Sequence, residues 1–190
     1  MRFLPEVLRR AYRQPVLQLR HPALVLVCVF AMPTTSLMAQ PRDLQGAYTI
    51  DAAASDSIEV AIVSGTADMN FAIRSLARSL IAKTNPRYER IEIRRSDTSV
   101  SVRFDVRPPI EMPNDGHPVR WVREDGGIYN VSVEWSAAQM VMRFLSDTGD
   151  RTNTLVLEPD GATLRFRVTL TSARLPGPIV YVLTYRRQAG

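Results

Sequence analysis

The sequence is poor in the side chains that most often carry chemistry. Its 190 residues include one cysteine, Cys28, and two histidines, of which only His117 lies beyond residue 39. With a single thiol the chain forms no internal disulfide, so a stable fold depends on its hydrophobic core. Nucleophilic catalysis needs a base within reach, and zinc sites need several histidine or cysteine ligands. We therefore expect a protein that is not an enzyme, with no catalytic residue, metal ion or cofactor.

A strong net charge is also missing from most of the chain. The sequence has 24 Lys and Arg against 19 Asp and Glu, and residues 1–39 hold five of the basic and one of the acidic residues. The 19 basic and 18 acidic residues that remain give residues 40–190 a net charge of +1. A nearly neutral chain with interspersed signs offers no electrostatic footprint for nucleic acid. We expect no nucleic-acid partner.

Long apolar runs are absent except near the N-terminus. Five arginines lie within residues 2–20, before an apolar run of about ten residues at 23–32. That run is well short of the roughly twenty residues that span a bilayer. Small Ala39 then precedes Gln40, which suits signal-peptide cleavage. We expect residues 1–39 to be a signal peptide, and the protein to be periplasmic or secreted with no integral membrane segment after cleavage. An uncleaved anchor and a lipoprotein modified at Cys28 are the alternatives.

Alternation of apolar and polar residues dominates the remaining chain, residues 40–190, which no linker or repeat divides and which we expect to be one domain. Val100, Val102, Phe104 and Val106 share one face of such a pattern. The expected strands are 48–50, 59–63, 89–95, 99–107, 118–124, 128–137, 139–145, 153–158, 162–172 and 179–187. Turn residues at 114–116, 124–127, 147–150 and 159–161 join neighbouring strands. The pattern predicts an all-β fold, an antiparallel meander that closes into a barrel of eight to ten strands.

One segment has helical spacing instead. Between Asp68 and Lys83 an apolar residue recurs every three or four positions, Asp68 can cap the start, and Pro86 lies just beyond the end. We expect one amphipathic helix here that covers the open end of the barrel; the same apolar stripe would also suit a membrane or a partner.

The first expected strand opens with Gly46-Ala47-Tyr48, which resembles the Gly-x-Trp signature of the lipocalin and calycin barrels, with tyrosine in place of tryptophan. In that family an arginine near the last strand packs over this aromatic ring and closes the bottom of the barrel, and Arg186 or Arg187 would match it. The helix after the first strands looks more like the helical lid of fatty-acid-binding proteins. The chain also looks like small exported bacterial proteins that carry an Asp and a Ser after the Gly-x-aromatic, here Asp51 and Ser55.

The resemblance implies a lipocalin-like barrel over residues 40–190 whose inward side chains line a filled core or a small apolar cavity. The inward set includes Phe71, Leu76, Leu80, Val102, Val133, Val168 and Leu183. The candidate cavity residues are Phe104, Trp135, Met140, Met142, Phe166 and Tyr181. We expect an exported β-barrel that binds a small hydrophobic ligand. The alternative is an envelope structural or interaction protein with a filled core and no ligand. An outer-membrane barrel would show the same alternation. It is disfavoured because residues 91–95 and 118–124 of the expected strands carry charged residues on both faces, including the face that would contact lipid.

Overall fold

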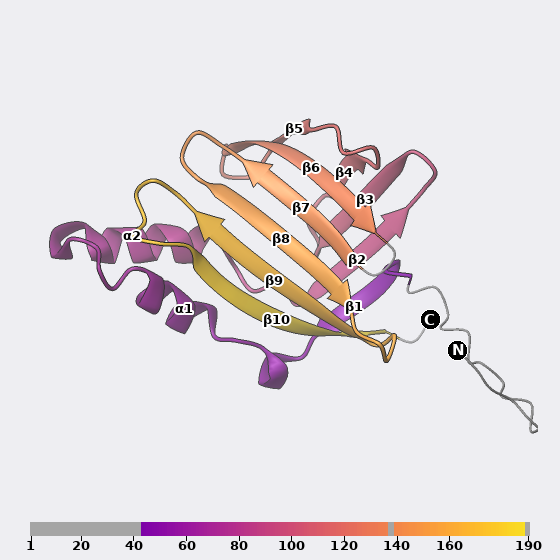
Figure 1. The fold of residues 1–190 in the computed structure, drawn as a ribbon, viewed down its shortest axis with the longest axis horizontal. Coiled ribbons are helices and arrows are strands. Elements are labelled where there is room, and N and C mark those ends of the chain that lie inside the picture. The colour runs from indigo at the N-terminus through magenta and orange to yellow at the C-terminus, as the bar shows by residue number, and fades with distance from the viewer. Residues whose placement is uncertain (1–42, 137–138, 189–190) are drawn as a thin grey trace, which may run out of the picture. The chain divides into compact units, whose positions relative to one another are not determined.

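The computed structural model describes residues 43–136 and 139–188. The predicted signal peptide and its cleavage site at Ala39/Gln40 lie outside these residues. The described part contains ten strands in one antiparallel sheet (Figure 1). The strands are β1 (Gly46–Ile50), β2 (Arg90–Arg95), β3 (Ser99–Phe104), β4 (Ile110–Pro113), β5 (Val119–Val122), β6 (Ile128–Ser136), β7 (Gln139–Leu145), β8 (Asp150–Leu157), β9 (Thr163–Thr171) and β10 (Ile179–Arg187).

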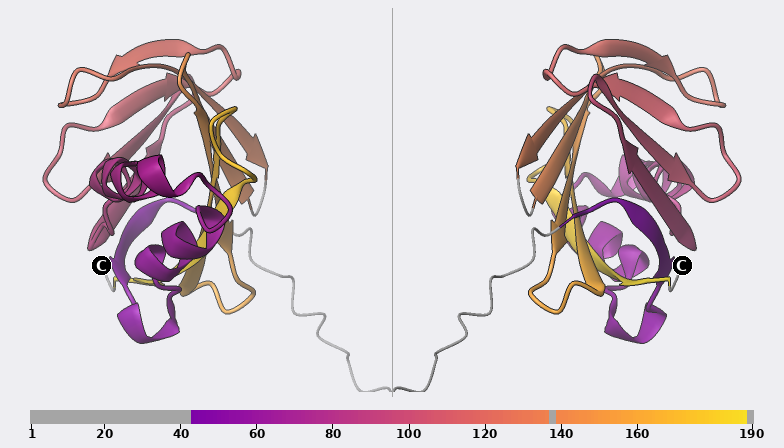
Figure 2. Two further views of the ribbon diagram at one scale, coloured as in Figure 1. Left: turned by 90° about the vertical axis from the view of Figure 1, so that its left-hand side faces the viewer. Right: turned by 90° about the vertical axis from the view of Figure 1, so that its right-hand side faces the viewer.

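The sheet curls into a nearly closed barrel (Figure 2). The strand order is β4-β3-β2-β1-β10-β9-β8-β7-β6-β5. Strand β1 pairs with both β2 and β10, so the first and the last strand of the sequence are neighbours in the sheet. The edge strands β4 and β5 approach each other without a backbone ladder. Both are four residues long and are bordered by prolines, which lack the N–H that a ladder needs, at positions 108, 109, 113 and 118. The predicted all-β meander is confirmed.

The apolar face of each long strand points into the barrel. In β9, for example, Leu164, Phe166 and Val168 are fully buried while Arg165 and Arg167 between them are exposed. The interior is filled by buried apolar side chains from every strand except β5. The largest fully buried ones are Tyr48, Tyr181, Tyr185, Phe166, Leu44, Ile91, Ile93, Met112, Met140, Met142, Leu155 and Leu157.

Two α-helices and a short 3-10 helix separate β1 from β2: η1 (Ala52–Ala54), α1 (Ile58–Gly65) and α2 (Phe71–Thr84). The prediction of a strand at 59–63 is wrong, because this segment belongs to α1. Ser57 caps α1 by accepting a hydrogen bond from the Val60 N–H. Ile58, Ala61 and Ile62, at helical spacing, then face the core. The prediction of a single helix is corrected accordingly.

The predicted amphipathic helix exists, with a later start. Asn70, not Asp68, caps α2, because its side chain accepts a hydrogen bond from the Ala72 N–H at 2.9 Å. The helix packs against α1, where Arg78 donates hydrogen bonds to the Thr66 hydroxyl and the Val63 carbonyl at its C-terminal end. Phe71 is 87% exposed, so its prediction as an inward residue is wrong. Within the described residues no helix combines the length and apolarity needed to cross a membrane.

Two strand predictions also change near β3. This strand ends at Phe104, because Asp105 takes a positive φ of 55° and its carboxylate accepts hydrogen bonds from the Glu89 and Arg90 N–H groups. Val106, predicted to share the apolar face of this strand with Val102 and Phe104, is therefore fully exposed. Strand β4 was not predicted, since prolines border it on both sides.

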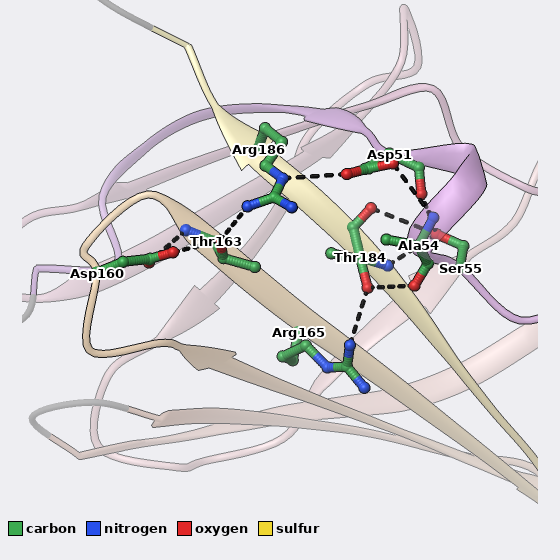
Figure 3. A network of polar contacts seen from close by, with 8 residues as sticks. All are labelled: Asp51, Ala54, Ser55, Asp160, Thr163, Arg165, Thr184 and Arg186. Atoms are coloured by element: carbon green, nitrogen blue, oxygen red, sulfur yellow. Dashed lines mark hydrogen bonds and ion pairs between the residues drawn. The ribbon is translucent and has the colours of Figure 1, made fainter.

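The Asp and Ser that follow the Gly-x-aromatic motif protect an open strand edge (Figure 3). Strand β1 ends at Ile50, so the edge of β10 that precedes Tyr185 has no neighbouring strand on that side. Ser55 Oγ accepts from the Thr184 N–H at 2.9 Å and donates to the Asp51 carbonyl, while Asp51 N–H donates to the Thr184 carbonyl. Arg186 adds an ion pair to Asp51 at 3.1 Å. These contacts satisfy backbone groups that a further strand would otherwise pair.

Candidate functional site

A cavity of about 660 Å³ lies at the mouth of the barrel, beneath α2. Its walls come from α2 and from the strand ends and turns of β3–β4, β5–β6, β7–β8 and β9–β10. A space of this size falls within the range of roughly 300–1,000 Å³ that small-molecule sites occupy. The helix therefore covers the open end of the barrel, as the sequence predicted, but leaves room below it.

The helical wall of the cavity is apolar and loosely packed. Ile73, Leu76 and Leu80 of α2 line the space, and Leu76 and Leu80 remain 63% and 54% exposed. No residue of α2 is buried. Apolar side chains that face a cavity without packing are available to be covered by an apolar ligand.

The barrel wall opposite α2 is aromatic. The ring centroids of Tyr88 and Phe104 lie 4.5 Å apart. The ring centroid of Trp121 lies 5.8 Å from that of Tyr129 and 5.8 Å from that of Phe144. All five rings line the cavity. Aromatic rings give this wall a rigid apolar surface.

Four arginines add positive charge to the cavity wall. Arg107 lies over the Tyr88 ring and reaches Glu124 at 3.9 Å. Arg123 lies over the Tyr129 ring and binds Asp125 at 2.6 Å, and its hydrogen bonds lower the pKa of that carboxyl to about 2. The other two, Arg151 and Arg174, have no carboxylate within ion-pair distance among the described residues. The site thus combines apolar walls with a few cationic groups.

The candidate cavity residues from the sequence separate into two groups. Phe104 lines the cavity. Met140, Met142, Phe166 and Tyr181 are fully buried in the filled interior, and Trp135 is half-buried at the far end of β6, with the Arg95 guanidinium 5.1 Å from its ring. None of these five is among the residues that line the cavity. Their role as ligand contacts stays a prediction.

Sequence reasoning missed most of the cavity wall. The helical residues Leu76 and Leu80 were predicted to face inward and do line it, but Trp121, Tyr129 and the arginines were not singled out. The sequence feature that could have identified these cavity residues is the group of aromatic and basic residues beside each turn, at 121–129 and 144–151.

The polar side chains that could suggest other chemistry have structural roles. Glu134 pairs with Arg143 across β6 and β7 on the outer face. His117 lies in an exposed turn, where its ring contacts Asp115 at 3.0 Å. Among the described residues no group of three or more His, Cys, Asp or Glu is placed to hold a metal ion.

Comparison with solved structures identifies the architecture. The chain superposes on a structure described as "REP1-NXSQ fatty acid transporter" with a TM-score of 0.51 at 12% identity, covering 78% of this chain and 98% of that one. The fold is a calycin-type β-barrel. Echinococcus granulosus fatty-acid-binding protein 1 matches at 14% identity and human cRBP IV at 17%, with TM-scores of 0.49 and 0.47. Each covers 77% of this chain and 98% of its own. No protein-family model and no curated protein matches the sequence.

Proposed function

We propose that this calycin-type barrel binds a small hydrophobic ligand in the cavity between α2 and the barrel mouth. The observation that carries the proposal is the unpacked apolar face of α2, where Leu76 and Leu80 point into a cavity of about 660 Å³ and stay more than half exposed. Covering these side chains would remove apolar surface from water. The similar fatty-acid transporter, by its description, supports a ligand of this class.

A direct test separates ligand contacts from fold stability. Leu76→Ala/Leu80→Ala removes the apolar face of α2 without opening a core cavity, and alanine is a better helix former than leucine. Burial of one leucine contributes roughly 1.5–3 kcal/mol, so affinity for palmitic acid or hexadecanol is expected to fall about tenfold or more. Native mass spectrometry and thermal shift of the purified protein measure binding, and the melting temperature without ligand is expected to be unchanged.

The matched control is Val60→Ala on α1, whose side chain is 67% exposed and does not line the cavity. This variant is expected to bind as the parent does. Equal binding by Leu76→Ala/Leu80→Ala and the parent protein would contradict the proposed site.

A second candidate function has its own observation. Val60 and Phe71 are exposed apolar residues of α1 and α2 that do not line the cavity. They favour an envelope structural or interaction protein that uses the helical face for a partner. The parent protein would then show no bound apolar molecule and no rise in melting temperature across the ligand panel.

We also propose that the protein is exported to the periplasm or the exterior of the cell. The basic and apolar pattern of residues 1–39 supports this compartment. Protein recovered from its own envelope fraction is expected to start near Gln40 by intact mass. A full-length mass that begins at Met1 would count against export by cleavage.

A further inference from the structure

Arg151 is held in place without being neutralised. It lies on the inward face of β8, half-buried in the cavity wall, two residues before the buried Asn153. Its Nε donates to Asn153 Oδ1 at 2.7 Å, and its Nη1 donates to Asn85 Oδ1 at 3.0 Å. Both acceptors are neutral amides. They orient the guanidinium but leave its positive charge without a counter-charge.

The other arginines of the cavity differ from Arg151. Arg107 and Arg123 have Glu124 and Asp125 as partners, and Arg174 is exposed to water, which screens its charge. Among the described residues, Arg151 Nη2 has no hydrogen-bond partner. A partly buried cation with free donors and no anion is costly, and a ligand anion would offset that cost.

A second donor without an acceptor lies near Arg151. The hydroxyl of Tyr181 is buried and has no hydrogen-bond partner among the described residues. Burial raises the pKa of Tyr181, against a smaller opposing effect of the Arg151 charge, so the phenol keeps its proton at neutral pH. Among the described residues, two donors in this part of the barrel, Arg151 Nη2 and the Tyr181 hydroxyl, therefore lack an acceptor.

We infer that Arg151 binds the anionic group of an amphiphilic ligand, a carboxylate in the simplest case, while the apolar part of the ligand lies against Leu76 and Leu80. This inference rests on the proposed function. A guanidinium offers two parallel donors to a carboxylate. In Arg151 these are an N–H of Nη2 and the second N–H of Nη1, while Nε stays on Asn153 and Nη1 keeps its bond to Asn85.

The position of Arg151 fixes the orientation of the ligand. Asn85, the C-cap of α2, holds Arg151 at the mouth of the barrel. The interior beyond it is filled by Met142, Leu155 and Phe166. The anionic end therefore lies beside the C-terminal end of α2, and the apolar chain runs along the helix instead of descending into the barrel.

A cation beside a helix C-terminus also stabilises the helix, so the test must separate that role from ligand binding. Palmitic acid and hexadecanol share the apolar chain and differ in charge at neutral pH. The parent protein is expected to bind the acid about tenfold or more tightly than the alcohol, because the carboxylate forms charge-assisted hydrogen bonds with Arg151 and the hydroxyl group does not. Arg151→Met is expected to lose this preference, with its affinity for the alcohol unchanged.

Asn153→Asp supplies the discriminating variant. It keeps the acceptor for Arg151 Nε and the cation at the end of α2, but places a carboxylate beside the guanidinium. We expect the preference for the acid to fall while helix content, followed by circular dichroism, is unchanged. Arg167→Met, at an exposed arginine on the outer face of β9 that does not line the cavity, is the control and is expected to keep the preference.

The outcomes separate the two proposals. A parent protein that binds acid and alcohol equally, or an Arg151→Met that keeps the preference, overturns the role of Arg151 and leaves the proposed function standing. A parent protein that binds neither compound overturns the proposed function, and the role of Arg151 with it.

Discussion

Arg187 joins three segments at the closed end of the barrel. Its guanidinium lies 5.1 Å from the centre of the Tyr48 ring and donates to the Tyr48 hydroxyl at 2.8 Å, to the Gln45 carbonyl at 2.8 Å and to the Asp43 carbonyl. Of the two arginines that could match the calycin pattern, this is the one that does. Gly46 belongs to the same cluster, because a Cβ there would lie 3.2 Å from Arg187 Nη1, and its φ is 141°.

Arg187→Met is expected to lower the free energy of unfolding by about 2 kcal/mol, because it leaves the buried Tyr48 hydroxyl and two carbonyls with fewer donors. Urea denaturation measures the change. Arg186→Met is the neighbouring control: its side chain is 55% exposed, and its ion pair with Asp51 is expected to contribute less than about 1 kcal/mol. Equal losses in the two variants would contradict the closing role of Arg187.

Among the elements, the long strands could be predicted from sequence and α1 could not. Strand β9 alternates apolar and polar residues throughout, and β6 does so from Tyr129 onward. Short turns then pair each strand with the strands next to it in the sequence. The segment of α1 is rich in β-branched residues and fits a strand as well as a helix. The cap at Ser57 and the packing of Ile62 decide between them, and only the second depends on tertiary structure.

The approach of α1 to β10 depends on Gly65. A Cβ at this position would lie 2.5 Å from Ile179 Cγ1, too close for any side chain without movement. Gly65→Ala is therefore expected to destabilise the protein by roughly 1–3 kcal/mol, as overpacking does. Thermal and urea unfolding measure the loss.

Two controls belong to this prediction. Gly177→Ala adds the same methyl group where no atom lies within 4 Å, and is expected to be neutral. In an Ile179→Ala background the cost of Gly65→Ala is expected to vanish, because the clashing Cγ1 is gone. A full cost in that background would show that the close approach to Ile179 is not its cause.

For the molecule as a whole, the sequence predicted which residues face inward better than where space remains among them. Met140, Met142, Phe166 and Tyr181 face inward, but together they fill the barrel. Whether inward side chains leave a cavity depends on how their volumes sum in three dimensions, which alternation does not report. The cavity lies instead where the strands end and α2 stands clear of them.

Ligand binding beneath α2 can be followed through the two tryptophans of the chain. Trp121 lines the cavity, whereas Trp135 lies on the outlying end of β6 against Arg95. Palmitic acid is titrated into Trp135→Phe and Trp121→Phe, and the remaining tryptophan is followed by fluorescence. If the ligand binds beneath α2, we expect a saturable change in Trp135→Phe, which reports Trp121, and none in Trp121→Phe. A saturable change confined to Trp121→Phe, or none in either variant, would contradict ligand binding in this cavity.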